Sequence, residues 1–343
     1  MKDIQVCGQP VAVALHGEPT ASPLLLIHGA GHDHDVWEPV APGLAAAGHR
    51  VIAPDLPGHG ASGGQALTDI DAMADWVLAL AAALGVDSFR IAGHSMGSLV
   101  ALAVAARAPD RVHALYLLGS LAPMPVAPFV LDAVRTDPPQ AWALINKFSF
   151  APVEVLGEQR RLELETANLE RMHKQGAAVL ATDLAACDRW QDGLQAATRV
   201  HCPVLLVSGD CDRMTPADAV VPLRDAFTGG GMGVGFNRIR LAQAKAGNGA
   251  IGASRQRFVR DAANDEIGPR RRARNRLGCR DNFGIDGRVG RGRAVGPADA
   301  DPACIRLPSK RRSNICLMGS CAKLGDCHWG LRTILFIAWS PGW

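Results

Sequence analysis

The stretch from residue 89 to residue 108 constrains the fold of this chain more than any other. An apolar run at 89–92 leads into Gly93-His94-Ser95-Met96-Gly97, and an alanine-rich segment with a helical pattern follows at 99–108. This order predicts a strand, a sharp turn and a helix. The two glycines indicate positions where a Cβ would collide with neighbouring backbone. Because the turn opens a helix, its serine would lie beside free N–H groups and the positive end of the helix dipole.

Apolar runs alternate with helical patterns on both sides of this turn. Strands are expected at 11–15, 24–28, 49–53, 89–92, 112–118 and 203–208, and helices at 36–47, 68–84, 99–108 and 216–227. Asp35 with Glu38, Thr68 with Asp71, and Thr215 would cap three of these helices. Continuous apolar strands that alternate with helices predict an α/β fold, a doubly wound and mostly parallel sheet that is covered on both faces.

Residues 121–200 interrupt the alternation. Prolines break the chain at 123, 125, 128, 138 and 139, and helical segments follow near 141–148, 158–173 and 177–190 with no strand between them. We expect a helical insertion over the carboxyl edge of the sheet, in the position of a lid. The loops at 28–34, 55–62, 93–97 and 119–123 meet at this same edge, where sheets of this kind bind ligands.

Four motifs, in order, resemble those of the α/β-hydrolase family, in its lid-bearing branch of esterases, lactonases and C–C-bond hydrolases. They are His28-Gly29-Ala30-Gly31, Asp55-Leu56-Pro57-Gly58-His59-Gly60-x-Ser62, Gly93-His94-Ser95-Met96-Gly97 and Gly209-x-x-Asp212-x-x-Thr215-Pro216. The resemblance covers residues 1–228. It implies a core made of residues 1–120 and 201–228, with residues 121–200 as the lid.

The resemblance also implies roles for individual residues. Ser95 would be the nucleophile, and the backbone N–H groups of Met96 and Ala30 would form the oxyanion hole. Asp212 would be the acid that orients a histidine, with Asp210 as its near rival. We expect an acyl-enzyme mechanism on an ester, lactone or related carbonyl substrate. The substrate would be a small molecule with an apolar acyl or aromatic part, and no cofactor or metal is expected.

The resemblance stops where the family places a strand, a Gly-His loop with the catalytic histidine, and a last helix. The only histidine after residue 228 is His328, 116 residues beyond Asp212. We therefore name His328 as the candidate base, in a sequence context that does not match the family. Without a base the chain would be impaired, and the alternative is a non-catalytic binding protein with the same fold.

Charge divides the chain at the same point. Residues 229–343 hold 18 Arg, 3 Lys and 8 acidic residues, a net charge of +13, whereas residues 1–228 hold 15 basic and 25 acidic residues, a net of −10. Three interpretations of this basic, weakly periodic tail stand open: a disordered arm that binds a polyanion, a small metal domain, or a replacement of the true C-terminus by a reading-frame shift. The metal domain would use Cys316, Cys321, Cys327 and His328, at spacings unlike those of zinc sites. The abrupt change favours the frame shift.

The remaining histidines have ordinary structural explanations. His28 and His59 occupy tight turns, and His94 is expected to pack beside the serine. His32-Asp33-His34-Asp35 resembles a metal cluster, but consecutive loop residues rarely converge on one ion, so His32 and His34 are expected at the rim of the pocket. The N-terminus lacks a secretory pattern and no apolar run has the length of a membrane span. We therefore expect a cytoplasmic protein, with no membrane or nucleic-acid partner for residues 1–228 and an undefined oligomeric state.

Overall fold

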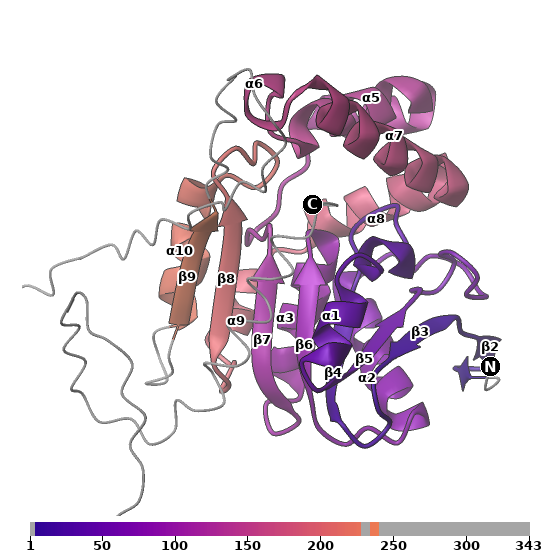
Figure 1. The fold of residues 1–343 in the computed structure, drawn as a ribbon, viewed down its shortest axis with the longest axis vertical. Coiled ribbons are helices and arrows are strands. Elements are labelled where there is room, and N and C mark those ends of the chain that lie inside the picture. The colour runs from indigo at the N-terminus through magenta and orange to yellow at the C-terminus, as the bar shows by residue number, and fades with distance from the viewer. Residues whose placement is uncertain (1–3, 228–233, 240–343) are drawn as a thin grey trace, which may run out of the picture. The chain divides into compact units, whose positions relative to one another are not determined.

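The computed structural model describes residues 4–227 and 234–239. Within them the centre is a seven-stranded sheet with the order β3-β5-β4-β6-β7-β8-β9, drawn as arrows in Figure 1. β3 (Val13–His16) is antiparallel to β5 (His49–Pro54), and all other neighbours are parallel. The other strands are β4 (Ser22–Ile27), β6 (Phe89–His94), β7 (Val112–Leu118), β8 (Val204–Gly209) and β9 (Val234–Ile239). A short hairpin precedes the sheet, formed by β1 (Gln5–Val6) and β2 (Gln9–Pro10).

Helices cover both faces of the sheet. Because side chains of a strand alternate between faces, Leu25 and Ile27 of β4 join one buried cluster and Leu24 and Leu26 join the other. The first cluster contains residues of α2 (Ile70–Ala83), α3 (Met96–Arg107), α9 (Gly193–Ala197) and α10 (Val221–Ala226). The second contains residues of the 3-10 helix η1 (His34–Trp37) and of α1 (Ala41–Ala46). The predicted doubly wound, mostly parallel α/β sheet is therefore confirmed.

All the regular secondary structure between β7 and β8 is helical, as the sequence predicts. It contains α4 (Pro128–Thr136), α5 (Pro138–Ser149), α6 (Val153–Leu156), α7 (Glu158–Gln175) and α8 (Ala177–Arg189), before α9. In Figure 1, α5 and α7 lie beyond the arrowheads of the central strands, at their carboxyl ends. This helical insertion has a small apolar core of its own, formed by Val130, Ala133, Val134, Ala141, Ile145, Met172, Leu180 and Leu184.

Three predicted helix starts are wrong. Pro39 and Pro42 divide the expected helix at 36–47 into η1 and α1, because proline lacks an N–H and restricts the residue before it. Asp33, not Asp35, caps η1 by accepting a hydrogen bond from the Asp35 N–H. Asp69, not Thr68, caps α2.

The third wrong start is the one expected at Thr215. The 3-10 helix η2 (Ala217–Val220) begins after Pro216, and the Thr215 hydroxyl donates to Asp212. Thr215 therefore does not cap this helix, which has no side-chain cap.

β9 is a strand that the sequence analysis did not predict. It pairs in parallel with β8 from Val204↔Val234 to Gly209↔Ile239. The sequence around it does not show a strand pattern, because glycine is depleted in strands and glycines occupy positions 229–231, 233 and 235. The sheet thus continues past the expected boundary at residue 228. The arginine runs and cysteines of the tail, together with His328, lie outside the described residues. No described helix has the length and hydropathy needed to cross a bilayer.

Candidate active site

Ser95 occupies a strained turn between β6 and α3. Its backbone has φ 52° and ψ −121°, a conformation that residues other than glycine rarely adopt. The Ser95 N–H donates to the Leu118 carbonyl at 3.0 Å. A Cβ on Gly93 would lie 2.0 Å from the Gly97 carbonyl oxygen, and one on Gly97 would lie 2.2 Å from that of Ile27. Both glycines are therefore required by backbone packing, and the turn holds Ser95 at the N-terminus of α3.

The loop after β4 packs directly against this turn. A Cβ on Gly29 would lie 3.3 Å from the Ser95 Cβ and 3.3 Å from the His94 carbonyl oxygen. The buried His28 side chain anchors the loop: its Nδ1–H donates to the Gly29 carbonyl at 2.9 Å, and its Nε2 accepts from the Leu56 N–H at 3.1 Å. Ala30, the next residue, is thereby held beside Ser95.

Asp212 lies in the loop that follows β8. Its Oδ1 accepts hydrogen bonds from the N–H groups of Met214 and Thr215, at 2.9 and 2.8 Å, and its Oδ2 accepts from the Thr215 hydroxyl at 2.6 Å. A Cβ on Gly119, at the end of β7, would lie 3.6 Å from Asp212 Oδ2 and 3.7 Å from His94 Cδ2. The Asp212 carboxylate and the His94 ring therefore both lie beside Gly119 at the end of this strand.

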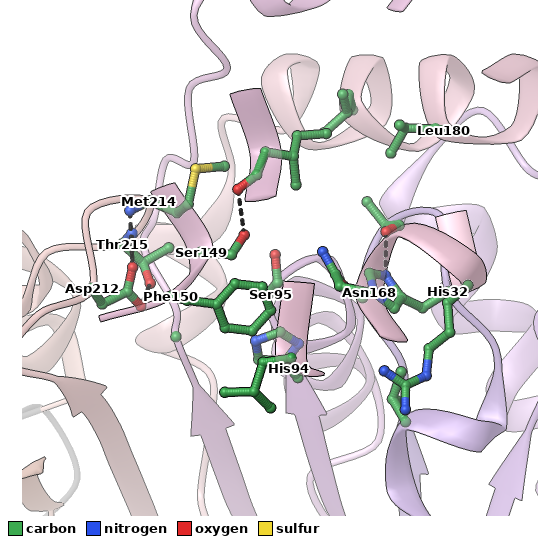
Figure 2. A pocket seen from close by; sticks show the side chains of 18 residues that line it. His32, His94, Ser95, Ser149, Phe150, Asn168, Leu180, Asp212, Met214 and Thr215 are labelled. Carbon is green, nitrogen blue, oxygen red and sulfur yellow. Dashed lines mark hydrogen bonds between the residues drawn. The ribbon is translucent and has the colours of Figure 1, made fainter. Parts of the chain in front are cut away.

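These groups line one cavity of about 180 Å³. In Figure 2, Asp212, Met214 and Thr215 lie on one side of Ser95, and His32 and Asn168 lie on the other. The helical insertion supplies much of the lining. The residues from the insertion are Ile145, Ser149, Phe150, Leu164, Asn168, Arg171, Leu180 and Leu184.

Of the residues predicted for the site, the structure places Ser95, Ala30 and Asp212 around this cavity. Met96 is buried as the first residue of α3, directly after Ser95. Asp210 is not among the residues that line the cavity. His328 lies outside the described residues, so the structure brings no predicted base to the serine.

Two of the described histidines line the cavity, His32 and His94. Burial, and secondarily the neighbouring His32, lowers the pKa of His94 to about 3. Burial also lowers the pKa of His32, although hydrogen bonds to Asn168 and Ala30 act in the opposite direction. His32 bridges the loop after β4 and the insertion: its ring nitrogens lie 2.7 Å from the Ala30 carbonyl oxygen and 2.7 Å from Asn168 Oδ1.

The expectation that His34 lies at the rim of the cavity is wrong, because His34 is not among the residues that line it. Its N–H and its Nδ1 both bond to Asp55 Oδ1, at 2.8 and 2.6 Å, which turns the ring toward the loop after β5. Asp33 instead accepts from Lys174 and Gln175 of α7. The run from 32 to 35 is thus divided among different partners. In the part of the chain that the structure describes, no group of three or more His, Cys, Asp or Glu could hold a metal ion.

A buried carboxylate that the sequence analysis missed joins the insertion to the core. Asp183 Oδ2, on α8, accepts from the Gly31 N–H at 2.8 Å and lies 2.9 Å from His59 Nε2. The side chains of Asp183 and His59 are both fully buried. Neither Asp183 nor the lining residues Asn168 and Arg171 belongs to a motif, so only the tertiary structure reveals them.

Comparisons with known proteins agree with this architecture. A family model described as alpha/beta hydrolase fold matches residues 22–234. A 2-hydroxymuconate semialdehyde hydrolase of Pseudomonas sp. (strain CF600) is 30% identical over 233 residues, covering 64% of this chain and 81% of the relative. The dihydrolipoyllysine-residue acetyltransferase component of the acetoin cleaving system of Pseudomonas putida is 34% identical over 212 residues, covering 59% of this chain. The chain spans only 55% of the length of that second relative.

Among solved structures, the enol-lactonase from Burkholderia xenovorans LB400 has a TM-score of 0.61 and 22% sequence identity, over 69% of this chain and 91% of that chain. At 22% identity this match shows a shared fold and nothing about function. The family match, by contrast, covers the sheet from β4 to the first residue of β9 and all the loops that build the cavity. This chain therefore belongs to the α/β-hydrolase family.

Proposed function

We propose that this protein is a serine hydrolase that cleaves an ester, a lactone or a related carbonyl compound through an acyl-enzyme. The observation that carries the proposal is the shared cavity: the strained Ser95 turn, the Gly29–Ala30 loop and Asp212 all line it. Relatives that include a 2-hydroxymuconate semialdehyde hydrolase and a pimeloyl-[acyl-carrier protein] methyl ester esterase support the reaction class.

In the proposed reaction, Ser95 Oγ attacks the carbonyl carbon of the substrate. The oxyanion that forms accepts hydrogen bonds from the backbone N–H groups of Met96 and Ala30, which are fixed before the reaction begins. Collapse of the tetrahedral intermediate expels the leaving group and leaves the acyl group on Ser95, and water then releases it. Asp212 would orient and stabilise the histidine that takes the serine proton.

The described residues do not supply a clear general base. Of the described residues that line the cavity, His32 and His94 are the histidines, and burial lowers the pKa of each. A ring whose pKa lies near 3 is a poor proton acceptor at neutral pH. His328 is the candidate base named from the sequence, and it lies outside the described residues. If it does not act on Ser95, the chain lacks one triad member, and a serine enzyme in that state retains about 10³–10⁴-fold catalysis over water. We therefore expect weak turnover.

We further propose that residues 121–200 act as a lid on a core formed by residues 1–120 and 201–228, extended by β9. Apolar side chains from the insertion, among them Ile145, Phe150 and Leu164, line the cavity. They favour a substrate with an apolar acyl or aromatic part, because burial of such a part removes it from water.

The test is hydrolysis of 4-nitrophenyl acetate and 4-nitrophenyl butyrate by the full chain. Ser95→Ala should abolish the acyl-enzyme, detected by mass spectrometry of the quenched reaction, and Asp212→Asn should reduce the amount that forms. His328→Ala should leave the weak turnover unchanged, and a loss of turnover in this variant would make His328 the base. Ser149→Ala is the matched control, because Ser149 lines the same cavity and its hydroxyl donates to the Ile145 carbonyl. An acyl-enzyme that still forms in Ser95→Ala would exclude Ser95 as the nucleophile. A chain with no Ser95-dependent turnover would favour the non-catalytic binding protein.

A further inference from the structure

The cations of helix α7 differ in how they are paired. Arg160 and Arg161 form ion pairs with Glu163 and Glu165, at 3.1 and 2.6 Å. Lys174 lies 2.7 Å from Asp33 Oδ2 and 3.2 Å from Asp35 Oδ2. Arg171 has no such partner among the described residues. It is also the one of these four cations that lines the cavity.

The sequence around Arg171 explains why the helix does not neutralise it. Side chains three or four positions away on a helix are neighbours, and these positions hold Ala167, Asn168, Lys174 and Gln175. None of them is acidic. The Arg171 guanidinium thus has five N–H donors, and no carboxylate lies three or four positions away on its own helix.

The other described residues of the cavity do not supply a free negative charge that would neutralise Arg171 either. Asp212 is the carboxylate among the described lining residues, and its oxygens already accept three hydrogen bonds from its own loop. His32 is close enough to Arg171 that this charge, after the larger effect of burial, contributes to lowering its pKa. In Figure 2, His32 lies on the opposite side of Ser95 from Asp212. The end of the cavity near His32 is therefore left with an uncompensated positive charge.

We propose that the cavity takes a substrate with a carboxylate group remote from the carbonyl that is cleaved, and that Arg171 binds this carboxylate. A guanidinium pairs with a carboxylate through two parallel hydrogen bonds, which fix the orientation of the ligand as well as its charge. The apolar lining would enclose the chain between the two ends. The proposal rests on the proposed function only in taking this cavity as the substrate site.

The experiment compares two ligands of similar size, monomethyl glutarate, which carries one carboxylate, and dimethyl glutarate, which is neutral. Binding is measured by isothermal titration calorimetry to the full chain carrying Ser95→Ala, which cannot consume either ester through the serine. The anion should bind about tenfold more tightly or better, a difference of about 1.4 kcal/mol. Adding Arg171→Met should remove this preference, and Arg171→Lys should retain part of it. Arg160→Met is the control, because Arg160 is on the same helix, pairs with Glu163 and does not line the cavity.

Equal affinity for the two ligands, no binding of either at millimolar concentration, or a preference that survives Arg171→Met would each overturn the proposal. Hydrolysis of monomethyl glutarate by the chain with Ser95 intact is a separate readout. If the ester is bound with the expected preference but not cleaved, the hydrolase proposal fails while the carboxylate site stands. If it is cleaved without any dependence on Arg171, the carboxylate site fails and the hydrolase stands.

Discussion

The imidazole rings of His28 and His59 lie 4.9 Å apart, centroid to centroid, and their surroundings shift their pKa values in opposite directions. Burial, together with the charge on His59, lowers the pKa of His28 to about 3. Burial alone would also lower the pKa of His59, but the hydrogen bond and the negative charge of Asp183 outweigh it and raise that pKa. The pair therefore combines a neutral ring with a neighbour that holds its proton more tightly than a free histidine does.

The first prediction concerns the pH dependence of stability. Because the folded-state pKa of His59 lies above its unfolded value, its pairing with Asp183 stabilises the fold fully below about pH 6.5 and loses this effect as pH rises through the folded pKa. The difference in unfolding free energy between the wild type and His59→Gln should thus be larger at about pH 6 than at about pH 9.5. Urea unfolding at both pH values measures it, and a difference that grows with pH would contradict the assignment.

The second prediction concerns Asp183. Asp183→Ala removes the acceptor of the Gly31 N–H and leaves the buried His59 ring without its partner. We expect a loss of about 3–5 kcal/mol in unfolding free energy. Asp75→Ala breaks an exposed ion pair with Arg107 and should cost no more than about 1 kcal/mol. Denaturant unfolding of both variants makes the comparison, and similar losses would mean that the buried pair is not a major contact.

The third prediction concerns the turn that carries Ser95. A Cβ at position 93 would overlap the Gly97 carbonyl, and backbone cannot yield as a side chain can. Gly93→Ala should cost more than about 3 kcal/mol or prevent folding. Gly48 is the control, since it has φ +90° but a Cβ added there would meet nothing within 4 Å. Gly48→Ala should cost only about 1–2 kcal/mol from its backbone conformation. Soluble yield and thermal unfolding distinguish the two, and an equal cost would mean that the close approach to the Gly97 carbonyl is relieved by a shift of the backbone.

The fourth prediction concerns the residues from about 245 onward, which lie outside the described residues. Their composition, with arginine runs such as 270–276 and few apolar residues, predicts a segment without a packed core. Limited trypsin digestion should remove it and spare residues 1–228. Mass spectrometry of the products identifies the boundary. A protease-resistant fragment from this region would instead support a folded domain.

The sequence predicts the centre of the fold better than its ends. The strands near Ile91, Leu115 and Leu206 are recognisable because a parallel sheet covered on both faces needs continuous apolar runs. Ser95 and Asp212 are recognisable because each lies in a tight turn whose neighbouring residues are constrained. β9 is not, since glycines weaken its pattern and only its pairing with β8 makes it a strand.

Residues whose role depends on distant partners could not be predicted. Asp183 is an ordinary helix residue until His59, 124 positions earlier in the chain, lies against it. Arg171 likewise stands out only when its neighbours on α7 are seen to be paired and it is seen to line the cavity. The lack of an acidic residue three or four positions from Arg171 can be read from the sequence. Its place in the cavity and the pairing of Asp183 cannot, because both arise from the packing of the insertion onto the core.

The position of β9 defines where a loop and a helix from a related hydrolase could be joined to the described residues. β9 ends at Ile239, directly beside Gly209 of β8, and the loop that holds Asp212 starts at that glycine. A segment spliced in after Ile239 from a related hydrolase would therefore emerge next to the carboxylate that its histidine has to meet. The junction for such a chimaera lies after the seventh strand of the sheet and not at the end of α10, so the sheet could be kept whole while the donor contributes only a loop and a helix.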